Sequence, residues 1–141
     1  MDHWKMKKLN IGDELPGLVI KPITRTNLAL YAQASGDHNP IHIDPDHAKN
    51  VGLSDVIAHG MLVMSYLGQA ITNQVKQSSI MEYGVKFSSM TRIGDTLTCK
   101  GSIVNVRQTD TGKLLKIELK VFDQNNDEKL IGFSKIALSK S

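Results

Sequence analysis

The stretch of residues 60–72, GMLVMSYLGQAIT, constrains the fold of this chain more than any other segment. In a helix it would be apolar on nearly every side, because it contains Met61, Leu62, Val63, Met64, Tyr66, Leu67, Ala70 and Ile71. A helix that is apolar all round is expected to be buried. At about 1.5 Å per residue it would be about 20 Å long, close to the span of one small domain. Ser65 and Gly68 are small residues at which a sheet could approach this helix closely.

The sequence after residue 80 alternates between apolar and polar side chains, as half-buried β-strands do. The alternation predicts strands at residues 83–88, 96–107, 115–121 and 129–139. In the second strand its phase shifts after Gly101, which suggests a β-bulge. Residues 110–112 and 123–127 are rich in turn-forming types, so the successive strands are expected to form an antiparallel meander.

Two shorter helices are expected before the buried one. The first begins after Thr24, a plausible N-cap, and ends in the turn-rich segment 35–40. No helix crosses that segment, because Pro40 lacks an amide hydrogen and restricts the residue before it. The second is bounded by Asp44 as its N-cap and by Gly52 as its stop.

A buried helix followed by a meander favours the α+β class, with an antiparallel sheet curled around the helix as in the hot-dog fold. The chain of 141 residues is expected to form one domain, 1–141, large enough to bury a core. No apolar run approaches the roughly 20 residues that span a bilayer, and the N-terminus lacks the apolar region of a secretory signal. The single Cys99 excludes an internal disulfide and fits a reducing compartment, so a cytoplasmic protein with no membrane segment is expected.

The net charge of +3 has two interpretations. It could favour a phosphate-bearing ligand or an acidic carrier protein, or it could simply aid solubility. No basic cluster alternates with aromatic residues, so nucleic-acid binding is not expected.

The densest group of polar side chains is SGDHNPIHID, residues 35–44. Asp37 and His42 lie five residues apart across the turn at Pro40, where a short loop could hold both against one substrate. A carboxylate and an imidazole that share one water could take and give the protons that hydration of a thioester needs, each transfer contributing about 10²–10⁴-fold. Each residue also has a purely structural interpretation. Asp37 and Asn39 could cap their own loop, and His42 could be a buried histidine that bonds a carbonyl.

The segment Ala58–Met61 lies where the buried helix begins. Free amides and the positive end of the helix dipole at such a place attract negative charge. Gly60 would let a carbonyl oxygen approach the backbone, so its amide is a candidate oxyanion donor. Alternatively, Gly60 is a small residue that the turn into the helix requires. His59 is better interpreted as a hydrogen-bonded structural residue than as a catalyst.

Two segments, YAQASGDHNPIHIDPDHA at 31–48 and IAHGMLVMS at 57–65, resemble the signature of the MaoC-like family of (R)-specific enoyl-CoA hydratases and (3R)-hydroxyacyl-ACP dehydratases. The resemblance runs from about residue 9 to the final strand. Within the family, the sequence is particularly similar to the catalytic subunit of the mycobacterial dehydratase. It implies reversible hydration of trans-2-enoyl thioesters, carried by CoA or by acyl carrier protein, without a cofactor.

The resemblance also implies roles for individual residues. Asp37 and His42 would hold and activate the catalytic water, and the amide of Gly60 would polarise the carbonyl. Asn39 would organise the loop near the site. Ser65 falls where many members have an active-site serine, but it is equally well explained as a small helix-packing residue.

The assembly that the resemblance implies is a single hot-dog domain, usually dimerised so that two sheets join and an acyl tunnel lies near the interface. A homodimer or higher oligomer is therefore expected, and a heterodimer is possible. Some relatives carry a second, degenerate hot-dog half for which 141 residues leave no room, so a partner could enlarge the acyl pocket.

Several other functions compete with hydration. A metal site could draw on His38, His42, His47, His59, Asp44 and Asp46. Because His38 and His42 straddle Pro40 and cannot share one helical face, no metal is expected. A hot-dog thioesterase would need a polar activator on the buried helix, where Ser65 and Gln69 are available. A non-catalytic acyl-binding subunit could lose the Asp–His pair, which is intact here. No G-x-S-x-G motif supports a serine hydrolase.

Overall fold

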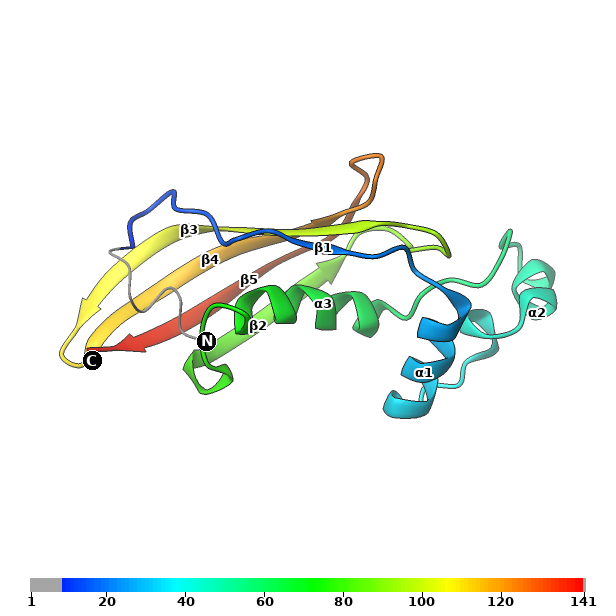
Figure 1. Cartoon of the computed structure of the whole chain (residues 1–141), viewed down its shortest axis with the longest axis horizontal. Coiled ribbons are helices and arrows are strands. Elements are labelled where there is room, and N and C mark those ends of the chain that lie inside the picture. Colours follow the sequence, from blue (N-terminus) through cyan, green and yellow to red (C-terminus); the bar gives the residue numbers. More distant parts are fainter. Residues whose placement is uncertain (1–8, 141) are drawn as a thin grey trace.

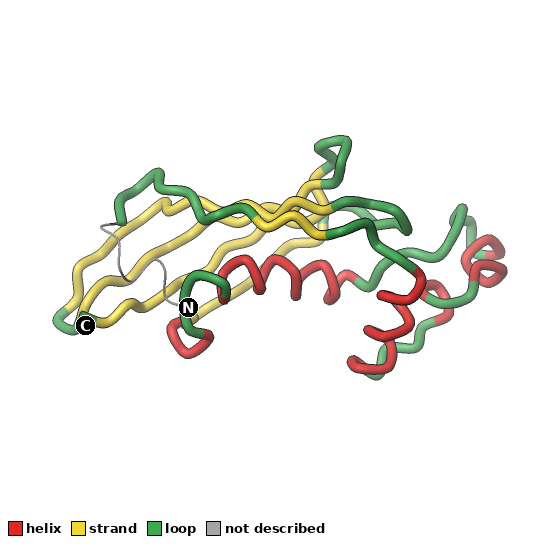
Figure 2. The backbone as a smooth tube through the Cα atoms, in the orientation of Figure 1, coloured by secondary structure: helices red, strands yellow, loops and turns green. Residues whose placement is uncertain are grey.

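The computed structural model describes residues 9–140, which form one antiparallel sheet with the helices on one side of it or beyond its end (Figures 1 and 2). The strands, in their order across the sheet, are β1 Leu18–Ile20, β3 Leu97–Thr109, β4 Gly112–Phe122, β5 Glu128–Ser139 and β2 Ile80–Phe87. The helices are α1 Arg25–Ser35, η2 Pro40–His42, α2 Pro45–Asn50, α3 Gly60–Thr72 and η3 Gln77–Ser79. The predicted α+β class is confirmed.

Helix α3 has the predicted bounds and runs along one face of the sheet (Figure 1). Leu67, Ala70 and Ile71 on its sheet-facing side are fully buried. They share a core with the inward-facing side chains of β4, which are Leu115, Ile117, Leu119 and Val121. Gly68 lies close to the ring of Tyr83 on β2, as expected of a small residue facing a sheet: an added Cβ would be 3.4 Å from that ring. The hydroxyl of Tyr83 donates to the carbonyl of Met64 at 2.6 Å.

The prediction that α3 is buried on all sides is wrong for one stripe. Met61, Ser65 and Gln69 are exposed, and Met61 exposes 56% of its surface. The physical reason is that a single sheet can cover only one face of a helix. Within residues 9–140, the stripe of α3 that carries these three residues is left uncovered.

The last three strands form the predicted meander, and the predicted bulge is present. Ile103 pairs with Ile117 and Asn105 with Lys116, so Val104 has no partner, slightly later than the predicted position. The predicted neighbour of β2 is wrong. Strand β2 lies at the far edge of the sheet and pairs with β5 instead of β3. The three-residue strand β1 was not predicted, since it is too short to show an alternation.

The predicted helix starts in the first half of the chain are confirmed. Thr24 caps α1, accepting a hydrogen bond from the amide of Asn27 in a capping box. Gly36 ends α1 in the left-handed conformation, with φ of 77°. Asp44 caps α2. The loop that carries Asp37 and His42 starts at Gly36 and ends at Asp44.

A buried ion cluster joins the β4–β5 turn to the segment that follows β2. The ammonium of Lys129, a residue only 4% exposed, lies 2.9 Å from Asp127 and 3.3 Å from Asp123. It also donates to the carbonyl of Met90 at 2.7 Å. The hydroxyl of Ser89 donates to the same Asp127 carboxylate at 2.9 Å. The cluster therefore holds residues 88–91 against the sheet.

Within residues 9–140, no helix combines the length and apolar character needed to cross a membrane.

Candidate active site

Local hydrogen bonds shape the loop between α1 and α2. The Asp37 carboxylate accepts a hydrogen bond from the amide of Asn39 at 3.2 Å. The Asn39 side chain in turn accepts one from the amide of Ile41, also at 3.2 Å, and so caps η2. Both residues thus make the loop-capping bonds that their residue types allow. In Asp37 these bonds use only one carboxylate oxygen, and the other is free for further contacts.

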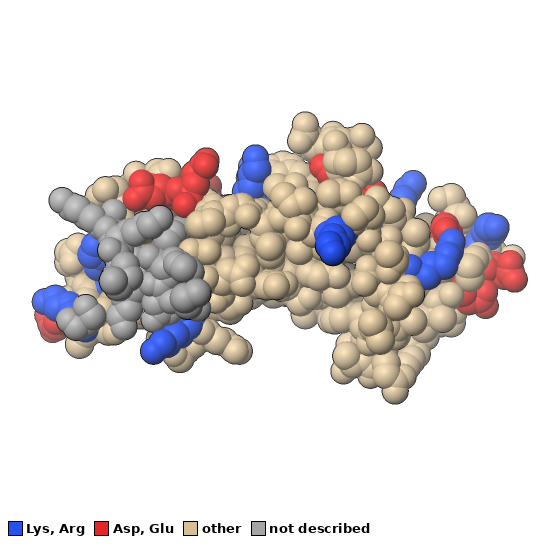
Figure 3. Space-filling view, viewed as in Figure 1, with Lys and Arg blue, Asp and Glu red and all other residues tan. Residues whose placement is uncertain are grey.

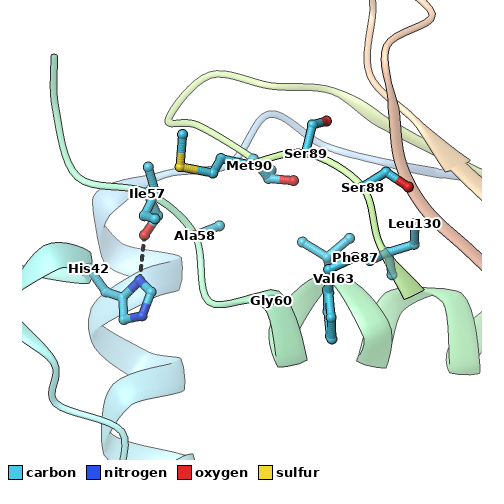
Figure 4. Close-up of a pocket in the computed structure, with 11 residues that line it drawn as sticks. His42, Ile57, Ala58, Gly60, Val63, Phe87, Ser88, Ser89, Met90 and Leu130 are labelled. Carbon is cyan, nitrogen blue, oxygen red and sulfur yellow. Dashed lines mark hydrogen bonds between the residues drawn. The ribbon is translucent and has the colours of Figure 1, made fainter. Parts of the chain in front are cut away.

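The buried side chain of His42 is fixed in orientation and in tautomer. Its Nδ1 lies 2.7 Å from the carbonyl oxygen of Ile57, which can only accept, so Nδ1 carries the hydrogen (Figure 4). Nε2 is left with a free lone pair, 3.9 Å from Oδ2 of Asp37. This distance is too long for a direct hydrogen bond. The gap suits one water that lies about 2.8 Å from each atom and bridges them. Solvent can reach this place, since the Asp37 side chain is 52% exposed.

His59 packs directly against this pair. Its Nε2 lies 3.0 Å from the backbone carbonyl of Asp37, and its ring stacks on that of His42 with 3.9 Å between centroids. The ring of Tyr31 meets it edge-on from another side. Nδ1 of His59 is buried and has no hydrogen-bond partner among residues 9–140. Burial lowers the pKa of His59, and the hydrogen bond to Asp37 offsets this only in part, so His59 is neutral at pH 7.

The geometry of Asp37, His42 and His59 could also hold a cation, because one donor atom from each lies within 4.8 Å of the others. However, Nε2 of His59 already carries a hydrogen toward Asp37, and its Nδ1 is buried. Only Asp37 and His42 then offer accessible donor atoms. Two donors suit a bound water better than a zinc ion, which takes at least three protein ligands.

The N-terminus of α3 lies beside His42. The helix begins at Gly60, and its N-cap residue, His59, makes no capping bond through its side chain. The first amides of the helix are therefore left to meet another acceptor, with the positive end of the helix dipole behind them. An added Cβ on Gly60 would lie 2.9 Å from the ring of Phe87, so glycine permits the close packing of these two residues.

A pocket of about 330 Å³ opens in front of these groups. Figure 4 shows His42 at one end of it, Gly60 in the middle and Val63, Phe87 and Leu130 at the other end. The pocket thus has a polar end with a base and free amides, and an apolar end. Such a site can bind a molecule with a reactive carbonyl and an apolar tail.

Ser65 is not brought to this pocket. It is exposed on α3, and its hydroxyl donates to the carbonyl of Leu62 at 2.6 Å, within its own helix. The structure therefore groups Asp37, Asn39, His42 and Gly60 but leaves Ser65 apart within one chain.

Sequence reasoning missed the carbonyl of Ile57, which orients His42, and the pocket-lining Phe87, Met90 and Leu130. The alternation around Phe87 predicts a strand, but it does not show that the Phe87 side chain lines a pocket.

Comparison with known proteins relates this chain to a protein family. A family model described as MaoC-like domain matches residues 9–125. The chain is similar to the mitochondrial 3-hydroxyacyl-[acyl-carrier-protein] dehydratase of Arabidopsis thaliana, with 28% identity over 84% of this chain and 70% of that protein. It is similar to the (R)-specific enoyl-CoA hydratase of Rhodospirillum rubrum, with 28% identity over 61% of each chain. The solved structure of the (R)-hydratase from A. caviae superposes with a TM-score of 0.83 at 24% identity, covering 94% of this chain and 98% of that one, which confirms the hot-dog fold.

Proposed function

This chain belongs to the MaoC-like domain family and is a hydro-lyase, and from that premise we propose that it reversibly hydrates trans-2-enoyl thioesters to (3R)-hydroxyacyl thioesters. The observation that carries the proposal is the 3.9 Å gap between Nε2 of His42 and Oδ2 of Asp37, beside the uncapped start of α3. The substrate would be an acyl group carried by CoA or by acyl carrier protein. The addition of water needs no electron carrier, so no cofactor enters the proposal. The single, buried Cys99 favours the cytoplasm as its location.

The geometry supports a sequence of proton transfers through one water. Asp37 would hold the water through one hydrogen, and the lone pair on Nε2 of His42 would accept the other. The water oxygen then bonds to C3 of the enoyl group while electrons of the C2=C3 bond move toward the thioester carbonyl. The amide of Gly60 and the dipole of α3 would stabilise the negative charge that develops on the carbonyl oxygen of the thioester. His42 then gives the proton that it took from water to C2 of the substrate. Dehydration follows the same steps in reverse.

The rival thioesterase function finds little support in the pocket. The polar residues of α3 that could activate a hydrolytic water are Ser65 and Gln69, and both are exposed. The hydroxyl of Ser65 is also bonded to its own helix. A non-catalytic acyl-binding role would leave the oriented tautomer of His42 without a purpose.

We expect the purified protein to consume trans-2-enoyl-CoA, seen as loss of the enoyl thioester absorbance, and to form the (3R)-hydroxyacyl product, seen by chiral analysis. Parallel assays of a chain-length series on CoA and on acyl carrier protein would identify the carrier and the acyl group. A free-thiol assay in the same reactions is the control, because hydration releases no thiol. Thiol release without hydroxyacyl product would establish a thioesterase, and no reaction on either carrier would refute the proposal.

The exposed faces of α3 and β2 support a further part of the proposal, a homodimer. Among the strands of residues 9–140, β2 pairs with β5 alone and so presents an edge of eight residues. Met61 and Met81 beside this edge are 56% and 64% exposed. Figure 3 shows few charged side chains in the middle of the view, where α3 lies in Figure 1. A second copy that pairs at β2 would cover these apolar side chains.

Sedimentation equilibrium is expected to give twice the mass of one chain, and Met81→Asp is expected to shift the protein toward the monomer by placing a charge in the interface. Leu30→Asp is the matched control, because Leu30 is an equally exposed apolar residue on α1, away from this face. A wild-type monomer at tens of micromolar would contradict the homodimer and direct attention to a different partner chain.

A further inference from the structure

His59 contacts both members of the proposed catalytic pair: its Nε2 bonds the backbone carbonyl of Asp37, and its ring stacks on that of His42. We propose that His59 is a positioning residue that sets the spacing between Asp37 and His42, an inference that rests on the function proposed above. It does so without contacting the substrate, through one hydrogen bond and one ring contact. The role differs from the purely structural one expected of a buried histidine.

The hydrogen bond of His59 ties the first part of the loop, residues 37–39, to a segment distant in sequence. The bonds formed by the amides of Asp37, Asn39 and Ile41 all end on side chains two residues away. Among residues 9–140, the bond from Nε2 of His59 to the carbonyl of Asp37 is the one hydrogen bond that joins residues 37–39 to a segment outside 32–42. Since the Asp37 side chain is exposed, packing alone would not hold the carboxylate in place.

The ring of His59 fixes the second member of the pair. It lies on the His42 ring with 3.9 Å between centroids and 23° between planes. The carbonyl of Ile57 holds His42 by one ring nitrogen, which still allows the ring to tilt. A flat neighbour against its face removes that freedom. His59 also immediately precedes Gly60, so the same residue relates both members of the pair to the start of α3.

The buried Nδ1 of His59 argues against a role in packing alone. In the part of the chain that the structure describes it has no hydrogen-bond partner, and burying an unpaired polar atom is unfavourable. A leucine or phenylalanine would fill the same space without that penalty. What histidine adds is a flat ring that also donates from Nε2. Its neutrality, which follows from the burial that lowers its pKa, keeps a second positive charge away from His42 when that ring takes a proton.

Two variants separate the hydrogen bond from the ring contact. His59→Phe keeps a flat ring and removes the donor, whereas His59→Gln keeps a donor and removes the ring. We expect His59→Phe to lower kcat for enoyl-CoA hydration by about 10²-fold, the usual consequence of a misplacement near 1 Å, with KM changed less than about threefold. His59→Gln is expected to recover part of that loss. Leu28→Ala is the control, because it removes buried packing from the adjacent α1 and leaves the Asp37 loop untouched.

Hydrogen exchange of the Asn39 and Ile41 amides provides a readout that does not depend on activity. We expect exchange at both amides to be about tenfold faster in His59→Phe than in the wild type, and unchanged in Leu28→Ala. Unchanged exchange, or a kcat for His59→Phe that falls only as far as it does in Leu28→Ala, would overturn the positioning role. If the wild-type protein hydrates no enoyl thioester, the proposed function fails, while the exchange result still decides whether His59 holds the loop.

Discussion

His42→Ala is expected to lower kcat for hydration of an enoyl thioester by about 10²–10⁴-fold, and Asp37→Asn by a similar factor. In His42→Ala the free Nε2 lone pair is lost, so no base takes the proton from water. Asp37→Asn keeps the oxygen that accepts from the Asn39 amide, so the loop is preserved while the negative charge that holds the water is removed. Steady-state rates from the loss of enoyl absorbance measure both effects.

The control for these variants is His38→Ala, because His38 is an exposed imidazole on the same loop, next to Asp37. Its kcat should stay within about twofold of the wild type. The double variant of Asp37 and His42 should be little slower than the slower single variant, because groups that act as a unit are not additive. Single variants that retain wild-type rates would remove both residues from the mechanism.

The second large effect is on stability. Lys129→Ala is expected to lower the free energy of unfolding by about 3–5 kcal/mol, because it leaves the buried carboxylates of Asp95 and Asp123 without their counter-charge. Lys120→Ala is the matched control: Lys120 pairs with Glu128 at 3.7 Å on the same hairpin but is half exposed, so its loss should cost about 0–1 kcal/mol. Urea unfolding at pH 7 compares the two variants. A loss below about 1 kcal/mol for Lys129→Ala would contradict the prediction.

The ion cluster also predicts how stability depends on pH. For Asp123, burial raises the pKa but is outweighed by hydrogen bonds from the amides of Asp127 and Asn125, so its pKa lies below the usual 3.8. The hydrogen bond from Lys129 lowers the pKa of Asp127. These carboxylates therefore stabilise the fold fully above their ordinary pKa, and that contribution disappears as pH falls through their lowered values.

Lys129 sets the alkaline limit of the same contribution. Burial lowers its pKa, but hydrogen bonds to Asp127 and Asp123 outweigh burial, so its pKa is raised above 10.5. The stabilisation is present below 10.5 and is lost as pH rises through the raised value. The difference in stability between the wild type and Lys129→Ala should thus be largest near neutral pH and shrink toward pH 2. A difference of the same size at both pH values would show that lost packing, and not charge, is responsible.

Features that depend on a few consecutive residues were predictable from the sequence. The apolar stretch and its leading glycine predict α3 from Gly60 to Thr72, and the structure confirms both bounds. Thr24 and Asp44 mark helix starts because a cap acts on the next two or three amides. Asp37 and His42 come together for the same reason, since a five-residue turn brings them close.

Features that depend on distant contacts were not predictable. The carbonyl of Ile57 reaches His42 across fifteen residues, and His59 reaches Asp37 across twenty-two, and neither contact follows a periodic pattern. The exposure of Ser65 could not be predicted from the sequence either. A helix that is apolar on nearly every side does not show which of its faces the sheet covers. The pairing of β2 with β5 is also long-range, and alternation within a strand says nothing about its neighbour.

The pocket draws its two ends from separate parts of the chain. The reactive groups lie between Asp37 and Gly60, whereas Phe87 and Leu130 of the apolar end lie well beyond them in sequence. Mutations that reshape the apolar end can therefore leave the reactive groups where they are. Over evolutionary time, members of such a lineage can diverge in the length or branching of the tail they accept while they inherit one unaltered chemistry.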